Sequence, residues 1–82
     1  MKIRQLRADT VKYLEDRALT AKWEKARRFF EVDMRRHSLK TELLEPRWRG
    51  IYSFRIDKKY RALFFITDGQ AEVFAITNHY KK

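Results

Sequence analysis

The chain has 82 residues, of which 44% are hydrophobic and 15% aromatic, and its formal net charge is +9. This length and apolar content predict one compact domain rather than a disordered chain. There is no cysteine and there are only two histidines, so a disulfide framework and a zinc–thiolate site are excluded, and we expect neither a metal nor a cofactor. The net charge predicts a polyanionic partner, either a nucleic acid or an acidic protein, with a membrane surface the least favoured.

Two further absences in the sequence bear on location. No apolar run approaches the roughly 20 residues that a membrane-spanning helix needs. The first residues, Met1-Lys2-Ile3-Arg4-Gln5, lack the apolar stretch of a signal peptide. We therefore expect a cytoplasmic protein with no membrane partner.

The first half of the chain predicts a short strand at residues 2–6 followed by two helices. Asp9 or Thr10 caps the first helix, which runs to about Ala18. Thr20 caps the second, which runs to about Arg36 and turns one apolar stripe inward: Trp23, Ala26, Phe30 and Met34. Residues 37–49 lack clear periodicity, and we interpret them as a loop with room for a short strand around residues 43–44.

After Gly50 the sequence alternates with a period of two. This pattern predicts three antiparallel strands, over residues 52–57, 61–66 and 72–78. The expected fold is α+β with the order β-α-α-β-β-β. Two helices pack on one face of a small, mainly antiparallel sheet in a single domain that spans residues 1–82.

Loop lengths decide which side chains share a face of this sheet. Three-residue loops at residues 58–60 and 67–69 place the even-numbered residues inward: Tyr52, Phe54, Ile56, Ala62, Phe64, Ile66, Phe74 and Ile76. The opposite face then carries Ser53, Arg55, Arg61, Thr77 and His79. A two-residue turn at Asp68-Gly69 would instead flip the last strand and bring Tyr80, not His79, beside Arg61.

The positive charge is dense between residues 47 and 61, where six basic residues accompany one acid, Asp57. We interpret this segment as a surface for the phosphate backbone of RNA. Trp48 either stacks on RNA or covers the edge of the core. The candidate phosphate contacts are Arg47, Trp48, Arg49, Arg55, Lys58 and Lys59.

Several short stretches together resemble the RelE/ParE superfamily of type II toxins. They are His37-Ser38-Leu39-Lys40-Thr41-Glu42-Leu43-Leu44, Gly50-Ile51-Tyr52-Ser53-Phe54-Arg55-Ile56, Tyr60-Arg61 and His79-Tyr80. Within that superfamily the chain is most similar to the YoeB-like branch of ribosome-dependent mRNA interferases. Members of this branch have a catalytic Glu 19 residues before an Arg and a His 18 residues after it. Here Glu42, Arg61 and His79 stand at the same offsets.

The resemblance implies metal-independent RNA cleavage by the ribose 2′-OH. Such a reaction needs a base for the 2′ proton, positive charge on the phosphorane, and an acid for the leaving 5′-oxygen. Glu42 is the candidate base, Arg61 the phosphate holder and His79 the acid, although base and acid can be exchanged. Tyr80 is expected to stack on a base or to orient the scissile phosphate.

The resemblance also implies partners and competing functions. Expected partners are mRNA on the ribosome, with contacts to rRNA, and a cognate acidic antitoxin; operator DNA is bound only through the antitoxin complex. One alternative is a ParE-like toxin that inhibits DNA gyrase and is not a nuclease. Another is an inactive relative that only binds nucleic acid.

Overall fold

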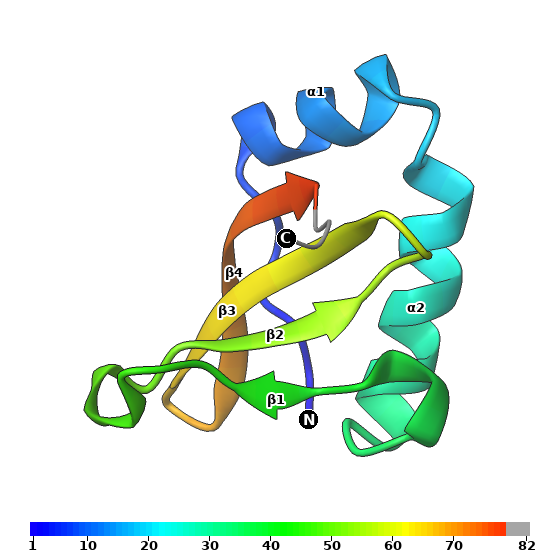
Figure 1. The fold of residues 1–82 in the computed structure, drawn as a ribbon. Helices are drawn as coiled ribbons and strands as arrows, with labels where there is room; N and C mark the ends of the chain where they lie inside the picture. Colours follow the sequence, from blue (N-terminus) through cyan, green and yellow to red (C-terminus); the bar gives the residue numbers. More distant parts are fainter. Residues whose placement is uncertain (79–82) are drawn as a thin grey trace.

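The period-two segments after Gly50 form an antiparallel meander in the computed structural model, which describes residues 1–78 (Figure 1). The fold is α+β, with two helices and a four-stranded antiparallel sheet in the order β1-β2-β3-β4. The strands are β1 (Glu42–Leu43), β2 (Tyr52–Arg55), β3 (Tyr60–Thr67) and β4 (Gln70–Asn78). The additional strand, β1, occupies the segment in which the sequence left room for a short strand. Neither helix in the described part has the length and apolar content to cross a membrane.

Both helices are shorter than the sequence predicts. Helix α1 (Ala8–Asp16) ends where Ala18 adopts the left-handed conformation with φ 55°. The Leu19 amide then donates to the Leu14 carbonyl at 2.8 Å, which is the Schellman arrangement without its usual glycine. The turn that ends the helix places Leu19 in the hydrophobic core, so burial of Leu19 stabilises this helix end.

Helix α2 (Thr20–Val32) ends before the predicted Arg36. Asp33 is extended, and its carboxylate accepts a hydrogen bond from the Arg35 amide at 3.0 Å. Short acidic side chains compete in this way with helical hydrogen bonding. The chain therefore leaves the helix early and forms two short 3₁₀ turns farther on, η1 (His37–Leu39) and η2 (Arg47–Arg49).

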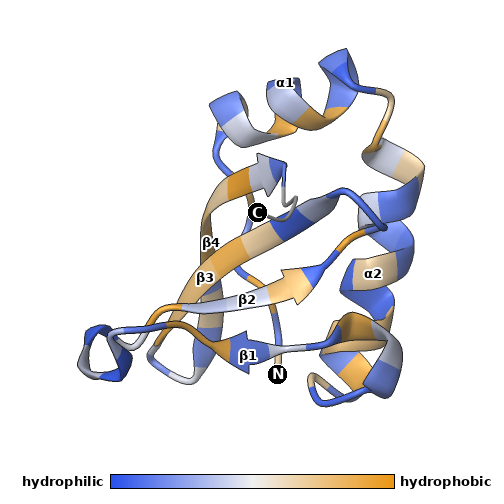
Figure 2. Ribbon diagram, viewed as in Figure 1, coloured by the Kyte–Doolittle hydropathy of each residue, from blue (hydrophilic) through white to orange (hydrophobic). Residues whose placement is uncertain are grey.

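The core lies between α2 and one face of the sheet. Phe30 of α2 packs on Phe54 and Phe64, with ring centroids 4.7 and 5.2 Å apart, and all three are fully buried. Trp23, about two turns earlier in the helix, stacks on Phe54. Figure 2 shows hydrophobic colours along the middle of β3, whereas both helices alternate between hydrophobic and hydrophilic residues. One face of each helix is thus buried, as the helical spacing predicts.

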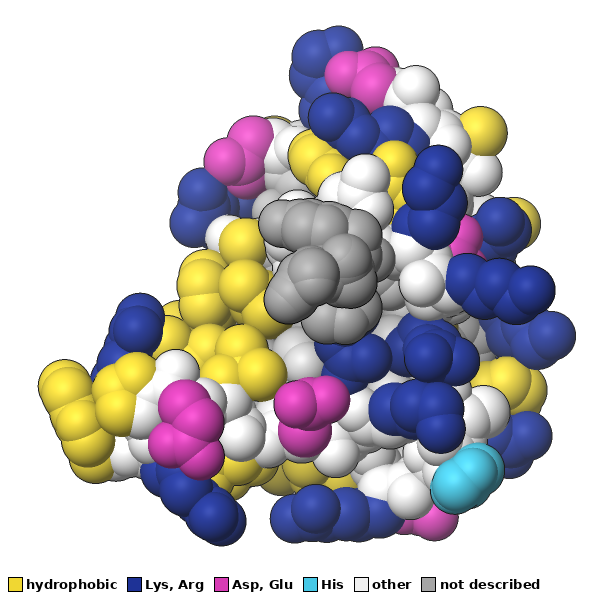
Figure 3. Space-filling model, viewed as in Figure 1, with side chains coloured by type: hydrophobic (Ala, Val, Ile, Leu, Met, Phe, Trp, Pro, Cys, Tyr) yellow, Lys and Arg dark blue, Asp and Glu magenta, His cyan; other side chains and the backbone are white. Residues whose placement is uncertain are grey.

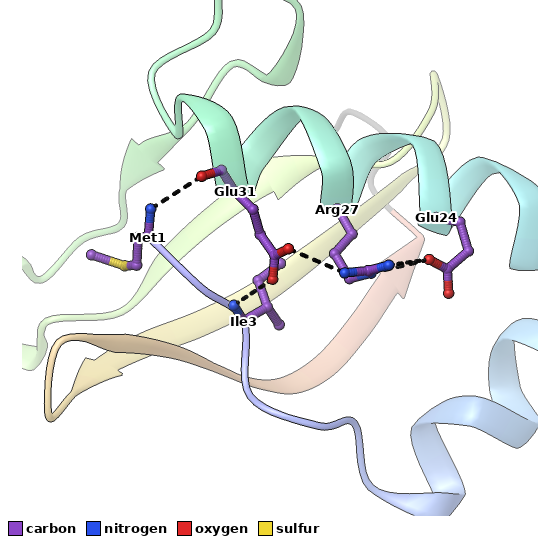
Figure 4. Close-up of polar contacts among 5 residues, drawn as sticks. All are labelled: Met1, Ile3, Glu24, Arg27 and Glu31. Carbon is purple, nitrogen blue, oxygen red and sulfur yellow. Dashed lines mark hydrogen bonds and ion pairs between the residues drawn. The ribbon is translucent and has the colours of Figure 1, made fainter.

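The N-terminal segment forms an isolated parallel bridge between Ile3 and Ala71 of β4 rather than the predicted strand. Figure 4 shows how it is fastened to α2. The Glu31 carboxylate accepts the Ile3 amide at 2.9 Å, and Arg27 holds the same carboxylate at 3.1 Å and Glu24 at 2.6 Å. The segment is therefore held by side-chain contacts as well as by backbone pairing.

The predicted length of the loop between β3 and β4 is wrong, but a bulge in β4 returns the end of that strand to its predicted face. Thr67 pairs with Gln70, so Asp68 and Gly69 form a two-residue turn, and both have positive φ. The register then shifts between Leu63 and Phe64. Because of this bulge, Thr77 pairs with Arg61 and so lies on the same face of the sheet, which is the face predicted for both.

The two-residue turn also changes which residues face the core in the part of β4 before the bulge. Ala71 and Val73 are buried, whereas Phe74 is only half-buried and stacks on Phe65, 5.8 Å away on the other face. Ile66, which we expected in the core, is 40% exposed near the end of the sheet. The predicted inward set is therefore wrong at Phe74 and Ile66.

The loop between β2 and β3 is displaced by one residue from its predicted place, because the Ile56 amide donates to the Tyr60 carbonyl. Asp57 organises this loop: its carboxylate accepts the amides of Lys59 and Tyr60, each at 2.8 Å, and contacts Lys22 of α2 at 3.2 Å. Burial alone raises the pKa of Asp57, but these amides and the Lys22 ammonium outweigh it and leave the pKa below its ordinary value.

We expect Asp57→Ala to lower the free energy of unfolding by about 1–2 kcal/mol at neutral pH, since hydrogen bonds to a charged acceptor are lost. A carboxylate with a depressed folded-state pKa stabilises above its unfolded pKa, about 3.9, and this contribution disappears as the pH falls through the folded value. Chemical unfolding at a series of pH values should therefore show wild type and variant converging below about pH 4. Asp57→Asn, which keeps one acceptor oxygen, should lose less. An equal loss at every pH would contradict this role.

Candidate active site

Glu42 is positioned by a loop that is anchored at two places. Leu39 of η1 is buried at 2% exposure, and the Thr41 hydroxyl donates to the Met34 carbonyl at 2.6 Å. Between them Lys40 is left-handed, with φ 47°, and turns the chain into β1. Glu42 pairs there with Ser53 of β2, so both residues lie on the same face of the sheet.

Arg61 reaches the same place from β3. Its cross-strand neighbour on β2 is Arg55, and its guanidinium extends diagonally across β2 toward β1. Nε donates to the Ser53 hydroxyl at 3.0 Å, and Nη2 donates to the Lys40 carbonyl at 2.6 Å. Nη2 also lies 3.6 Å from Oε2 of Glu42. These three contacts fix the plane of the guanidinium.

The two charged groups differ sharply in exposure. Arg61 is 7% exposed as a residue, whereas the Glu42 side chain is 62% exposed. Burial lowers the pKa of Arg61; Glu42 acts in the opposite direction, and the neighbouring cation Arg55 lowers the pKa further. A guanidinium keeps its charge in proteins nonetheless. The site therefore combines a rigid, partly desolvated cation with an accessible carboxylate.

This arrangement suits an anionic ligand that carries a transferable proton. A guanidinium offers planar donors that match phosphate oxygens, and its charge counts for more where water is excluded. Among residues 1–78 no hydrogen bond engages Nη1 of Arg61. A carboxylate within 4 Å of the bound anion can accept a proton from an adjacent hydroxyl.

The other predicted phosphate contacts divide into two groups. Arg55 is half-buried beside Arg61, and Lys58 and Lys59 are exposed on the loop that leads into β3. Arg47, Trp48 and Arg49 form η2, in the loop between β1 and β2, which Figure 1 shows at the opposite end of the sheet. Trp48 is 85% exposed, so it does not cover the core. The structure thus brings the first group, and not the second, toward Arg61.

His79 and Tyr80 lie outside the described residues. The predicted acid and stacking residue therefore stay predictions. The last described cross-strand pairs, Arg61–Thr77 and Tyr60–Asn78, carry the end of β4 alongside Arg61.

Sequence reasoning missed two groups that hold Arg61, the Ser53 hydroxyl and the Lys40 carbonyl. Alternation had placed Ser53 on the face of Arg61, and a small polar residue at 2% exposure beside a guanidinium is a hydrogen-bond partner by its chemistry. The Lys40 carbonyl has no signal in the sequence, because every residue carries one.

No family model matches this chain, and no curated protein matches it. Within residues 1–78, no group of three or more His, Asp or Glu side chains is arranged to hold a metal ion. Inference about function consequently rests on the resemblance in the sequence and on the geometry around Arg61.

Proposed function

We propose that the chain is the toxin of a type II toxin–antitoxin system, a RelE/ParE-like domain with the order β-α-α-β-β-β that cleaves mRNA on the ribosome. The observation that carries the proposal is the 3.6 Å contact between Glu42 and Arg61, two residues that are far apart in the sequence. They stand at the spacing of the YoeB-like catalytic pair. The net charge of +9 supports a polyanionic substrate.

In the proposed reaction, the ribose 2′-OH attacks the adjacent phosphorus and the bond from phosphorus to the 5′-oxygen breaks. Glu42 takes the 2′ proton, and Arg61 neutralises the charge that builds on the non-bridging oxygens. His79 gives a proton to the departing 5′-oxygen, and Tyr80 orients the phosphate. The products are a 2′,3′-cyclic phosphate and a free 5′-OH, and the exchange of roles between Glu42 and His79 gives the same products.

The ribosome has a physical role in this proposal. An exposed carboxylate is a weak base, because water already solvates its charge. An mRNA strand held by the ribosome would cover Glu42, exclude water and align the 2′-OH with phosphorus, which lowers the entropic part of the barrier. The basic residues on the loop between β2 and β3, Lys58 and Lys59, would then contact neighbouring phosphates.

A groove of about 310 Å³ between α2 and the loop that joins β2 to β3 suits the acidic antitoxin. Its apolar floor includes Phe29 and Ile56, and the charged residues of its rim are three cations and one acid: Lys22, Lys25, Arg55 and Asp57. In the view of Figure 3, Lys and Arg side chains gather on the right, whereas hydrophobic side chains gather on the left over the sheet. An amphipathic segment with acidic flanks complements both the floor and the rim.

The test is to map mRNA 5′ ends in cells shortly after the protein is induced. We expect new 5′-OH ends inside translated regions, in phase with codons, because the ribosome positions the substrate. Codon-phased ends should vanish when translation initiation is blocked, which serves as the control. Growth arrest with DNA damage signals and unchanged mRNA would favour a gyrase inhibitor. No arrest at all would favour a relative that only binds nucleic acid.

A further inference from the structure

A second basic hollow lies next to the candidate active site, outside the segment that we expected to bind phosphate. It has a volume of about 380 Å³ and is lined by Arg35, Arg36, His37, Lys40, Thr41 and Glu42. Every one of these side chains is polar or charged, so the hollow differs from the groove on α2, whose floor is apolar. Three permanent cations face one acid there, and that acid already lies against Arg61.

Part of this hollow is held in place before any ligand arrives. The Arg36 guanidinium lies 3.7 Å from the centre of the Phe29 ring, and its Nε donates to the Ser38 hydroxyl at 3.2 Å. A cation stacked on an aromatic ring loses little freedom when it binds an anion. Arg35 and Lys40 are exposed and have no ion pair among residues 1–78. Their charges are therefore available to a ligand.

The hollow is connected to Arg61 through the backbone. The Lys40 carbonyl accepts from Nη2 of Arg61, while the Lys40 side chain lines the hollow, and Glu42 borders both places. An anionic polymer bound at Arg61 therefore passes directly into a second set of cations. Because the hollow has no apolar floor, it suits a phosphate backbone better than an amphipathic helix, which needs an apolar surface on which to bury its apolar face.

We propose that the hollow formed by residues 35–42 is a subsite for a second phosphodiester of the same single-stranded RNA, next to the phosphate at Arg61. This inference rests on the proposed function for its substrate. It adds a binding role for Arg35, Arg36 and Lys40 that serves affinity and the direction of the strand. These residues touch phosphate away from the bond that breaks, so they position the substrate.

The test measures the binding of a ten-nucleotide single-stranded RNA whose 2′-O-methyl groups prevent cleavage, by fluorescence anisotropy over a range of salt. The variant is Arg35→Gln/Lys40→Gln, which leaves the Arg36–Phe29 stack intact. The control, Lys12→Gln/Arg28→Gln, removes the same charge from exposed positions on the two helices. We expect the hollow variant to bind roughly tenfold more weakly than the control. Its salt slope should be smaller by about 0.7 for the one phosphate lost.

Affinity and slope equal to those of the control would overturn the subsite, as would wild type that does not bind this RNA. If the double variant unfolds, Arg35→Gln and Lys40→Gln are measured singly, with circular dichroism as the check on folding. Failure of this inference is distinguishable from failure of the proposed function. Codon-phased cleavage with unchanged RNA affinity removes only the subsite, whereas weakened binding without any cleavage in cells removes only the nuclease.

Discussion

Arg61→Gln is expected to lower the rate of ribosome-dependent mRNA cleavage by about 10²–10³-fold, the range for loss of a preorganised donor at a developing oxyanion. The reason is geometric. Hydrogen bonds to Ser53 and to the Lys40 carbonyl hold the guanidinium at one place on the sheet, so its charge needs no reorganisation during the reaction. Cleavage is measured on programmed ribosomes by primer extension.

Loss of stability must be separated from loss of chemistry in this variant. Arg61 is 7% exposed, and its removal leaves the buried Ser53 hydroxyl without its partner, at a cost of about 1–3 kcal/mol. The unfolding free energy is therefore measured in parallel. Arg61→Lys keeps the charge but lacks the planar fork that reaches Ser53 and Lys40 together, so cleavage should fall by an intermediate amount.

Ser53→Ala supplies the matched control for Arg61. It removes the Nε acceptor and leaves the guanidinium charge at the site, so Ser53 acts as a positioning residue. Cleavage should fall much less than in Arg61→Gln, although the two losses of stability are similar. A folded Arg61→Gln protein that cuts mRNA at the wild-type rate would remove Arg61 from the mechanism and leave the phosphate to another cation.

The sheet shows why a residue pattern predicts faces better than loops. The alternation of Tyr52 to Ile56 fixes which residues face α2, because apolar burial has a strict period of two. The turn at Asp68-Gly69 and the bulge before Ala75 each shift the pairing by one residue in the same direction. Because a shift of two residues keeps the face, Thr77 returns to its predicted face of the sheet with a different cross-strand partner. The apolar side chain of Phe74 is compatible with either face of the sheet, so the sequence contains no signal for the bulge.

The candidate site shows a similar division between side chains and backbone. The resemblance to the YoeB-like branch implied that Glu42 and Arg61 approach each other, and they are 3.6 Å apart. Arg47 and Arg49 were grouped with Arg61 because they are close in sequence and share its charge. The strands β1 and β2 separate them in space, since η2 joins the far ends of those strands. The hollow at Arg35 to Glu42 was missed because Arg35 and Arg36 were expected to belong to α2, apart from the loop that carries Lys40.

Glu42→Gln is expected to reduce cleavage by about 10²–10⁴-fold, the usual range for loss of a general base, with little effect on folding. The Glu42 side chain is 62% exposed, and an ion pair with one exposed partner contributes at most about 1 kcal/mol. Glu45→Gln is the matched control, because it makes the same charge change at another exposed position just after β1. Cleavage by Glu45→Gln should match wild type.

The coupling between Glu42 and Arg61 distinguishes catalysis from simple RNA binding. If both act on one phosphate, the double variant Glu42→Gln/Arg61→Gln should lose little more activity than the worse single variant, since residues that act as a unit are strongly non-additive. If Glu42 only shapes the local charge, its removal should strengthen RNA binding, because an acid beside the phosphate path repels it. Faster cleavage by Glu42→Gln, with tighter RNA binding, would therefore rule out its role as base and leave the proton transfer to another group.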